Sequence, residues 1–238
     1  MSNEIYISKL IDERNEEIFK KVCEKFIIEF AESDNQEHSV YSINNEVTFY
    51  IPKGVFDVDS FSHELLHVYM DYYDVRLTSN FKLTMWQSNI FKRLFDTRLS
   101  EHITNSISHT LMLPHFLSLG FDRSKFLFDY EEFKCESGFI NQISKFYRQG
   151  NKFSLSAIRN FIGKYFAFKC DPNTEFDYSK ELKQLKVIDD KLFNIINDYY
   201  QMWDNYDFTN DEYSEFREKN SLLYISLKPW LNGKIFID

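Results

Sequence analysis

The chain has 238 residues, a formal net charge of −9 and 43% hydrophobic residues, including 25 phenylalanines and 15 tyrosines. This is enough apolar material for one large domain or for a domain with a substantial extension, while 6 glycines and 4 prolines disfavour a turn-rich all-β fold. The acidic balance disfavours direct binding of nucleic acid, because an acidic surface repels the phosphate backbone.

The cysteines and the lack of long apolar runs indicate the compartment. Cys23, Cys135 and Cys170 are far apart and form no CxxC pair, which favours a reducing compartment over a disulfide framework. The charged N-terminal segment lacks the apolar core of a signal peptide, and no apolar run reaches the roughly 18 residues that span a membrane. We therefore expect a cytoplasmic protein without a membrane partner.

The first part of the chain predicts a helix and then a β-hairpin. Residues 15–32 place apolar side chains at helical spacing, at Ile18, Val22, Phe26, Ile27 and Phe30. The stretch SVYSINNEVTFYIPKG predicts two strands with the turn at INNEV, because Val47, Phe49 and Ile51 alternate on one face of the second strand. Pro52 and Gly54 end the second strand.

Helices are predicted for most of the remaining chain. Asp57 or Asp59 can cap a helix that runs to about Tyr73, because carboxylates accept hydrogen bonds from the first free N–H groups of a helix. The looser stretch DVRLTSNFKLT leads to a helix that is expected near 85–97, and another helix is expected from about 100 to 113, where Pro114 would end it. Apolar periodicity at helical spacing is clearest over residues 180–203.

These elements predict an α+β fold that is predominantly helical, with a small antiparallel sheet beside the helix that begins near Asp57. We expect a first domain at 1–120 and a helical C-terminal region at 121–238. Gly120 and the stretch CDPNTEFD at 170–177 are the two candidates for a boundary.

Residues 63–67 read HELLH and are the strongest chemical signal in the chain. On a helix, His63 and His67 share one face and can bind one metal ion, while Glu64 lies beside them as a general base. The alternative is a buried helix that carries the pattern by chance. Burial of such polar side chains is costly unless they are bonded, so we favour a zinc site.

A catalytic zinc ion needs a third protein ligand, and a second stretch, EHITNSISHTLMLPHF, offers candidates. Glu101, Asn105 and His109 recur every four residues and share a helix face, whereas His102 points elsewhere. The pattern alone leaves Glu101 and His109 as rival ligands.

Together, the HELLH helix and the stretch EHITNSISHTLMLP resemble the ImmA/IrrE family of metallopeptidases, whose second motif reads E-x-x-A-N-x-F-A-x-x-L-L-M-P. Glu101, Asn105, Leu111 and Pro114 match it in position, and the departures affect packing residues only. The resemblance covers about residues 40–120.

This resemblance implies a zincin-like metallopeptidase domain in which Zn²⁺ is bound by His63, His67 and Glu101. Asn105 would then support the ligands, and His109, about 12 Å beyond Glu101 along the helix, would be too far to bind the same ion. His109 and His115 are candidates for substrate contacts. The implied substrate is a regulatory protein, often a helix-turn-helix repressor.

The stretch 139–166 loosely resembles a helix-turn-helix segment and is the most basic part of the chain. Three functions therefore compete: a zinc endopeptidase, a zinc-bearing module that binds a regulator without cutting it, and a DNA-binding regulator acting through 139–166. We favour the endopeptidase, because a module that only binds has no use for Glu64, and because the chain is acidic.

Overall fold

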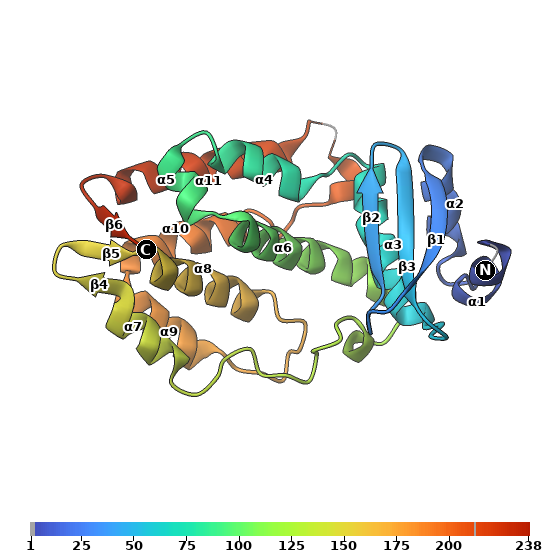
Figure 1. Ribbon diagram of the computed structural model, residues 1–238, viewed down its shortest axis with the longest axis horizontal. Coiled ribbons are helices and arrows are strands. Elements are labelled where there is room, and N and C mark those ends of the chain that lie inside the picture. The colour runs from blue at the N-terminus through green and yellow to red at the C-terminus, as the bar shows by residue number, and fades with distance from the viewer. Residues whose placement is uncertain (1–2, 212) are drawn as a thin grey trace. The chain divides into compact units, whose positions relative to one another are not determined.

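The computed structural model describes residues 3–211 and 213–238 and shows a predominantly helical α+β protein with small sheets (Figure 1). The chain forms two compact units, each built from two separate stretches. The first unit comprises Met1–Val75 and Thr110–Glu131, and the second comprises Arg76–His109 and Glu132–Asp238. This division differs from the expected one, because residues 76–109 group with the C-terminal part of the chain.

The first unit contains a three-stranded sheet with the strand order β1-β3-β2. β1 pairs with β3 in parallel and β2 pairs with β3 antiparallel, so the sheet is mixed, where an antiparallel one was expected. Its elements are α1 (Asn3–Leu10), α2 (Glu16–Lys25), β1 (Ile27–Ser33), β2 (Ser39–Ile43), β3 (Glu46–Pro52), α3 (Val58–Tyr72) and η1 (Arg123–Lys125).

The predicted hairpin is confirmed. β2 and β3 pair from Ser39 opposite Tyr50 to Ile43 opposite Glu46, so INNEV contains the turn. Asn44 adopts a left-handed backbone conformation with φ of 55°, which asparagine tolerates better than most residues.

The helix predicted for residues 15–32 is wrong in its second half. α2 ends at Lys25, and Ile27–Ser33 forms the strand β1. This segment is rich in β-branched and aromatic residues, and its alternate side chains Ile28 and Phe30 turn toward the core. Its partner β3 is the second strand of the hairpin and follows β2 in the sequence, so local periodicity could not reveal the pairing.

The core of the first unit lies between the sheet and α3. Val47, Phe49 and Ile51 alternate along β3 and are almost completely buried. The rings of Phe49 and Phe61 lie 4.9 Å apart, so α3 is anchored to the centre of the sheet. Figure 1 shows α3 behind the three strands.

The second unit is mainly helical. Its helices are α4 (Leu77–Met85), α5 (Asn89–Leu94), most of α6 (Thr97–Ser118), α7 (Phe139–Tyr147), α8 (Leu155–Lys169), α9 (Ser179–Ile188), α10 (Asp190–Gln201), η2 (Phe208–Asn210) and α11 (Glu215–Leu231). Its strands, β4 (Arg148–Gln149), β5 (Lys152–Ser154) and β6 (Ile235–Ile237), form a second sheet in this order.

Several predicted helix ends differ from those observed. α6 continues through Pro114 to Ser118, because a proline removes one backbone hydrogen bond but does not force a long, packed helix to end. The helical segment indicated by the apolar periodicity of residues 180–203 is interrupted at Asp189. The side chain of Asp189 accepts a hydrogen bond from the backbone N–H of Leu192, which caps α10 and separates it from α9.

The stretch 139–166 forms a helix, a short hairpin and a second helix. The hairpin of β4 and β5 turns at Gly150, whose φ is 60°, and β5 also pairs with β6. Ser154 caps α8 by accepting from the N–H of Ala157. A helix-turn-helix motif joins its helices by a turn of about three or four residues, so this stretch has a different connection.

Candidate metal site

The HELLH residues lie on α3, as predicted. Asp57 caps this helix: its side chain accepts hydrogen bonds from the N–H of Asp59 and from the hydroxyl of Ser60. The apolar residues of α3 are buried, including Phe61, Leu65, Leu66 and Val68, and this packing orients the histidines on the remaining face.

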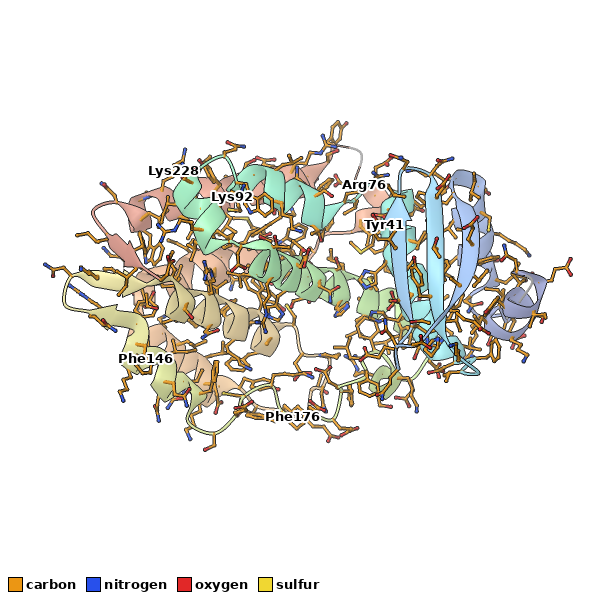
Figure 2. All side chains as sticks on the ribbon, viewed as in Figure 1. Tyr41, Arg76, Lys92, Phe146, Phe176 and Lys228 are labelled. Atoms are coloured by element: carbon orange, nitrogen blue, oxygen red, sulfur yellow. The ribbon has the colours of Figure 1, made fainter. Side chains whose placement is uncertain are left out.

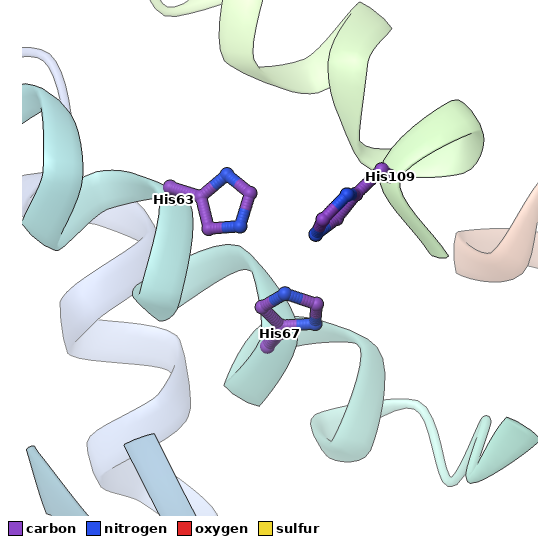
Figure 3. Close-up of side chains that lie close together, drawn as sticks. All are labelled: His63, His67 and His109. Atoms are coloured by element: carbon purple, nitrogen blue, oxygen red, sulfur yellow. The ribbon is translucent and has the colours of Figure 1, made fainter. Parts of the chain in front are cut away.

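His63 and His67 form a group with His109 that could hold a metal ion. One ring nitrogen from each histidine lies within 4.8 Å of the other two. Figure 3 shows the rings of His63 and His67 projecting from α3 and that of His109 approaching them from α6. His109 directly precedes Thr110, where the continuous helix α6 enters the first unit.

The donor set fits a small dication. Imidazole nitrogens bind Zn²⁺ at about 2.0–2.1 Å, which places neighbouring nitrogens of a tetrahedral site about 3.4 Å apart. The spacing of up to 4.8 Å is larger than this but within reach of side-chain rotation. Three protein ligands would leave one coordination position for water or substrate.

The surroundings of the two α3 histidines keep them neutral. His63 is buried, its ring lies 4.8 Å from that of Phe126, and it hydrogen-bonds to the Phe126 backbone. Burial, followed by the proximity of His67, lowers the pKa of His63 to about 3, and burial lowers that of His67 to about 4. Neutral imidazole is the form that binds metals.

Glu64 lies beside this group, half-buried on α3. Burial raises the pKa of its carboxyl to about 8, and Glu37 adds to the increase, while a hydrogen bond from the Val40 backbone opposes it. Since Val40 belongs to β2, the edge strand of the sheet holds the carboxyl in place. Such a strong shift at a group beside a potential metal site is typical of functional residues.

Contacts with α3 are repeated along β2. Ser42 donates a hydrogen bond of 2.6 Å to Asp71, which lies two turns beyond Glu64 on the same helix face. Asp57, two turns before Glu64, acts electrostatically on the buried ring of His38, just before β2. The strand therefore runs along the helix face that carries Glu64.

Glu101 lies outside the histidine group. It is exposed and accepts a hydrogen bond of 2.7 Å from Lys82 on α4, with which it forms an ion pair. The group that the structure brings together thus differs from the ligand set that the family resemblance implies. His109, two turns further along α6 than Glu101, is the third member of the group. In the sequence, only its position eight residues after Glu101, on the same helix face, indicated this role.

The other residues considered from the sequence have separate surroundings. Asn105 is exposed on α6. The ring of His115 packs edge-on against Tyr69 at 6.4 Å. His102 hydrogen-bonds through Nε2 to the backbone oxygen of Gly163 at 2.9 Å, so it joins α6 to α8 as a packing residue. Within the described residues, none of the three belongs to the group of His63, His67 and His109.

No protein-family model, curated protein or solved structure matches this chain. Among the described helices, none combines the length and apolar character required to cross a membrane.

Proposed function

We propose that this protein is a zinc-dependent endopeptidase that cuts a specific intracellular regulatory protein. The observation that carries the proposal is the convergence of His63, His67 and His109 beside Glu64. Metallopeptidases with an HExxH helix need this combination, two ligands one turn apart and an adjacent carboxylate. In this proposal His109 is the third ligand in place of Glu101, and the fold is zincin-like.

A zinc ion held by these histidines would polarise a peptide carbonyl and a water molecule, and its charge would lower the pKa of Glu64. Glu64 accepts the proton of the attacking water and delivers it to the leaving amine. Val40 orients the carboxyl through its backbone N–H. Phe126 holds the ring of His63 through its backbone, a support that metal-binding histidines commonly have.

The substrate class rests on the motif resemblance, which implies a transcriptional repressor. The DNA-binding alternative loses support, because 139–166 has a hairpin between its helices. Two of its cations also have partners: Arg159 forms an ion pair with Asp96 at 3.1 Å, and Lys164 donates to the backbone oxygen of Lys134.

The experiment compares wild type with Glu64→Gln, each co-expressed with candidate regulators. Glutamine keeps the size of the side chain but cannot accept a proton, so cleavage should fall by about 10³-fold or more at unchanged zinc content. Mass spectrometry of the regulator detects the cut, and elemental analysis measures the zinc.

Glu101→Gln is the matched control, since it removes the same charge from α6. Equal cleavage by wild type and Glu64→Gln would refute the mechanism. Binding of a regulator without cleavage by either protein would support the interaction module.

A further inference from the structure

The sheet of the first unit has a second face, which points away from α3. Since Val47, Phe49 and Ile51 point inward, the alternate residues of β3 point to the opposite side. The strand register arranges the outward residues in three rows: Ile27, Glu46 and Ile43; Glu29, Thr48 and Tyr41; and Ala31, Tyr50 and Ser39. We call these nine residues the outer sheet face.

The outer sheet face exposes large apolar side chains. The exposed fractions are 56% for Ile27, 58% for Tyr41, 51% for Ile43 and 36% for Tyr50. Figure 2 labels Tyr41 on β2. An isolated exposed apolar residue is common, but the exposed face of a sheet is normally polar, so four large exposed apolar side chains on one small face indicate an interaction site.

The charges on this face have a single sign. Glu29 and Glu46 are its charged members, and neither has a cation as a cross-strand neighbour: Glu46 lies between Ile27 and Ile43, and Glu29 lies beside Thr48. The patch is therefore apolar and acidic, within a chain of net charge −9. A complementary partner carries lysine or arginine beside apolar side chains.

We propose that the outer sheet face docks a basic, apolar segment of the protein substrate. This rests on the proposed function, because it identifies the bound segment as part of the protein to be cut. β2 links the two regions: Tyr41 belongs to the outer sheet face, and the neighbouring Val40 holds Glu64 on the other side. A second copy of this chain fits less well, since stacked faces would bring the carboxylates of Glu29 and Glu46 together.

The test uses three synthetic peptides of equal length, which alternate leucine with lysine, leucine with glutamate, and serine with lysine. The full chain carrying Glu64→Gln binds them without cutting them, and fluorescence anisotropy measures each affinity. The leucine–lysine peptide should bind about tenfold or more tightly than either of the others. Methyl NMR signals of Ile27 and Ile43 should shift when it binds.

Three variants test whether the outer sheet face is the binding surface. Reversing both charges, with Glu29→Lys and Glu46→Lys, should transfer the preference to the leucine–glutamate peptide. The control reverses two exposed carboxylates of the second unit, with Glu136→Lys and Glu218→Lys, and should keep the preference for lysine. Tyr41→Ser weakens binding without changing the charge.

The proposal is overturned if the three peptides bind equally or not at all, or if both double variants change affinity alike. It is also overturned if sedimentation shows a dimer that Tyr41→Ser separates, because the face would then bind a second copy. Failure of the proposed function looks different, since it shows as absent zinc or absent cleavage while peptide binding persists.

Discussion

The helices α3 and α6 both carry polar residues four apart on one face, yet they differ in what the sequence reveals. On α3, His63 and His67 lie one turn apart, so their convergence follows from helix geometry alone. On α6, Glu101, Asn105 and His109 share a face, and tertiary packing selects which of them reaches the other helix. Helical spacing therefore predicts which two residues of one helix can bind a common ion, while tertiary packing decides which third residue lies near them.

The largest expected effect belongs to the pair on α3. His63→Ala or His67→Ala should lower zinc affinity by well over about 100-fold, because the loss of a supporting residue already costs about 10–100-fold. Elemental analysis after dialysis measures the bound metal. His102→Ala is the control, since His102 bonds to Gly163, and this variant should keep its zinc. Full zinc content in either α3 variant would rule out the site.

The second prediction separates the residues of α6. His109→Ala should lose zinc as the α3 variants do, whereas Glu101→Ala should keep it and lose only an exposed ion pair with Lys82. Isothermal titration with zinc gives both affinities. The reverse result would restore the ligand set that the family resemblance implies.

The third prediction concerns pH and uses metal-free protein. The folded-state pKa of Glu64 is about 8, above its unfolded value near 4.5, so folding takes up a proton between these values. Its contribution to the free energy of unfolding therefore falls as pH rises through this window, by about 1.4 kcal/mol for each pH unit.

Glu64→Gln removes this titration. The stability of the variant relative to wild type should therefore increase from about pH 5 to about pH 8, as measured by urea unfolding. The lowered pKa values of His63 and His67 act in the opposite direction below about pH 6.5, but they are common to both proteins and cancel in the difference. A difference that does not change with pH would contradict the burial of Glu64.

A smaller effect compares the two helix caps. Asp57 caps α3, and Asp96 accepts a hydrogen bond from the N–H of Leu99 at the start of α6. Asp57→Ala and Asp96→Ala should each reduce stability by about 1 kcal/mol, measured by thermal unfolding. Asp57→Asn and Asp96→Asn keep a capping side chain and should be milder. Loss of stability in only one pair would show that one helix depends less on its cap.

The smallest effect concerns the packing of α8 against α6. A Cβ atom added at Gly163 would lie 3.6 Å from the ring of His102 and 3.7 Å from Leu99, which are ordinary contacts. Gly163→Ala should therefore stabilise the protein by about 0.5–1 kcal/mol, because alanine loses less backbone entropy in a helix. A fall in melting temperature would show that α8 approaches α6 more closely than these distances indicate.

Local features of the sequence predicted the part of the fold that local forces determine. The hairpin with its turn after Ile43, the cap at Asp57 and the helix with HELLH are all confirmed. In each case the signal and the structure lie within a few residues of one another. Ser154 is a further local cap, because its side chain accepts a hydrogen bond from the N–H of Ala157 in the first turn of α8.

Features that depend on distant partners were missed. β1 was assigned to a helix because its parallel partner β3 lies beyond β2, and the hairpin at Gly150 was not foreseen because it pairs with β6 near residue 235. The break at Asp189 has a similar cause. Its carboxylate accepts hydrogen bonds from Tyr147 and Trp230, which come from distant helices.

The discontinuous first unit affects how the protein can be divided. A fragment that ends at residue 120, the boundary expected from the sequence, would contain HELLH and His109 but would lack Phe126, which holds the ring of His63. It would also lack η1 and the rest of the stretch that ends at Glu131. A gene truncated there should give a poorly folded product. One protease cut where the chain passes from one unit to the other should leave fragments that stay associated, because at least one unit contains residues from both sides of the cut.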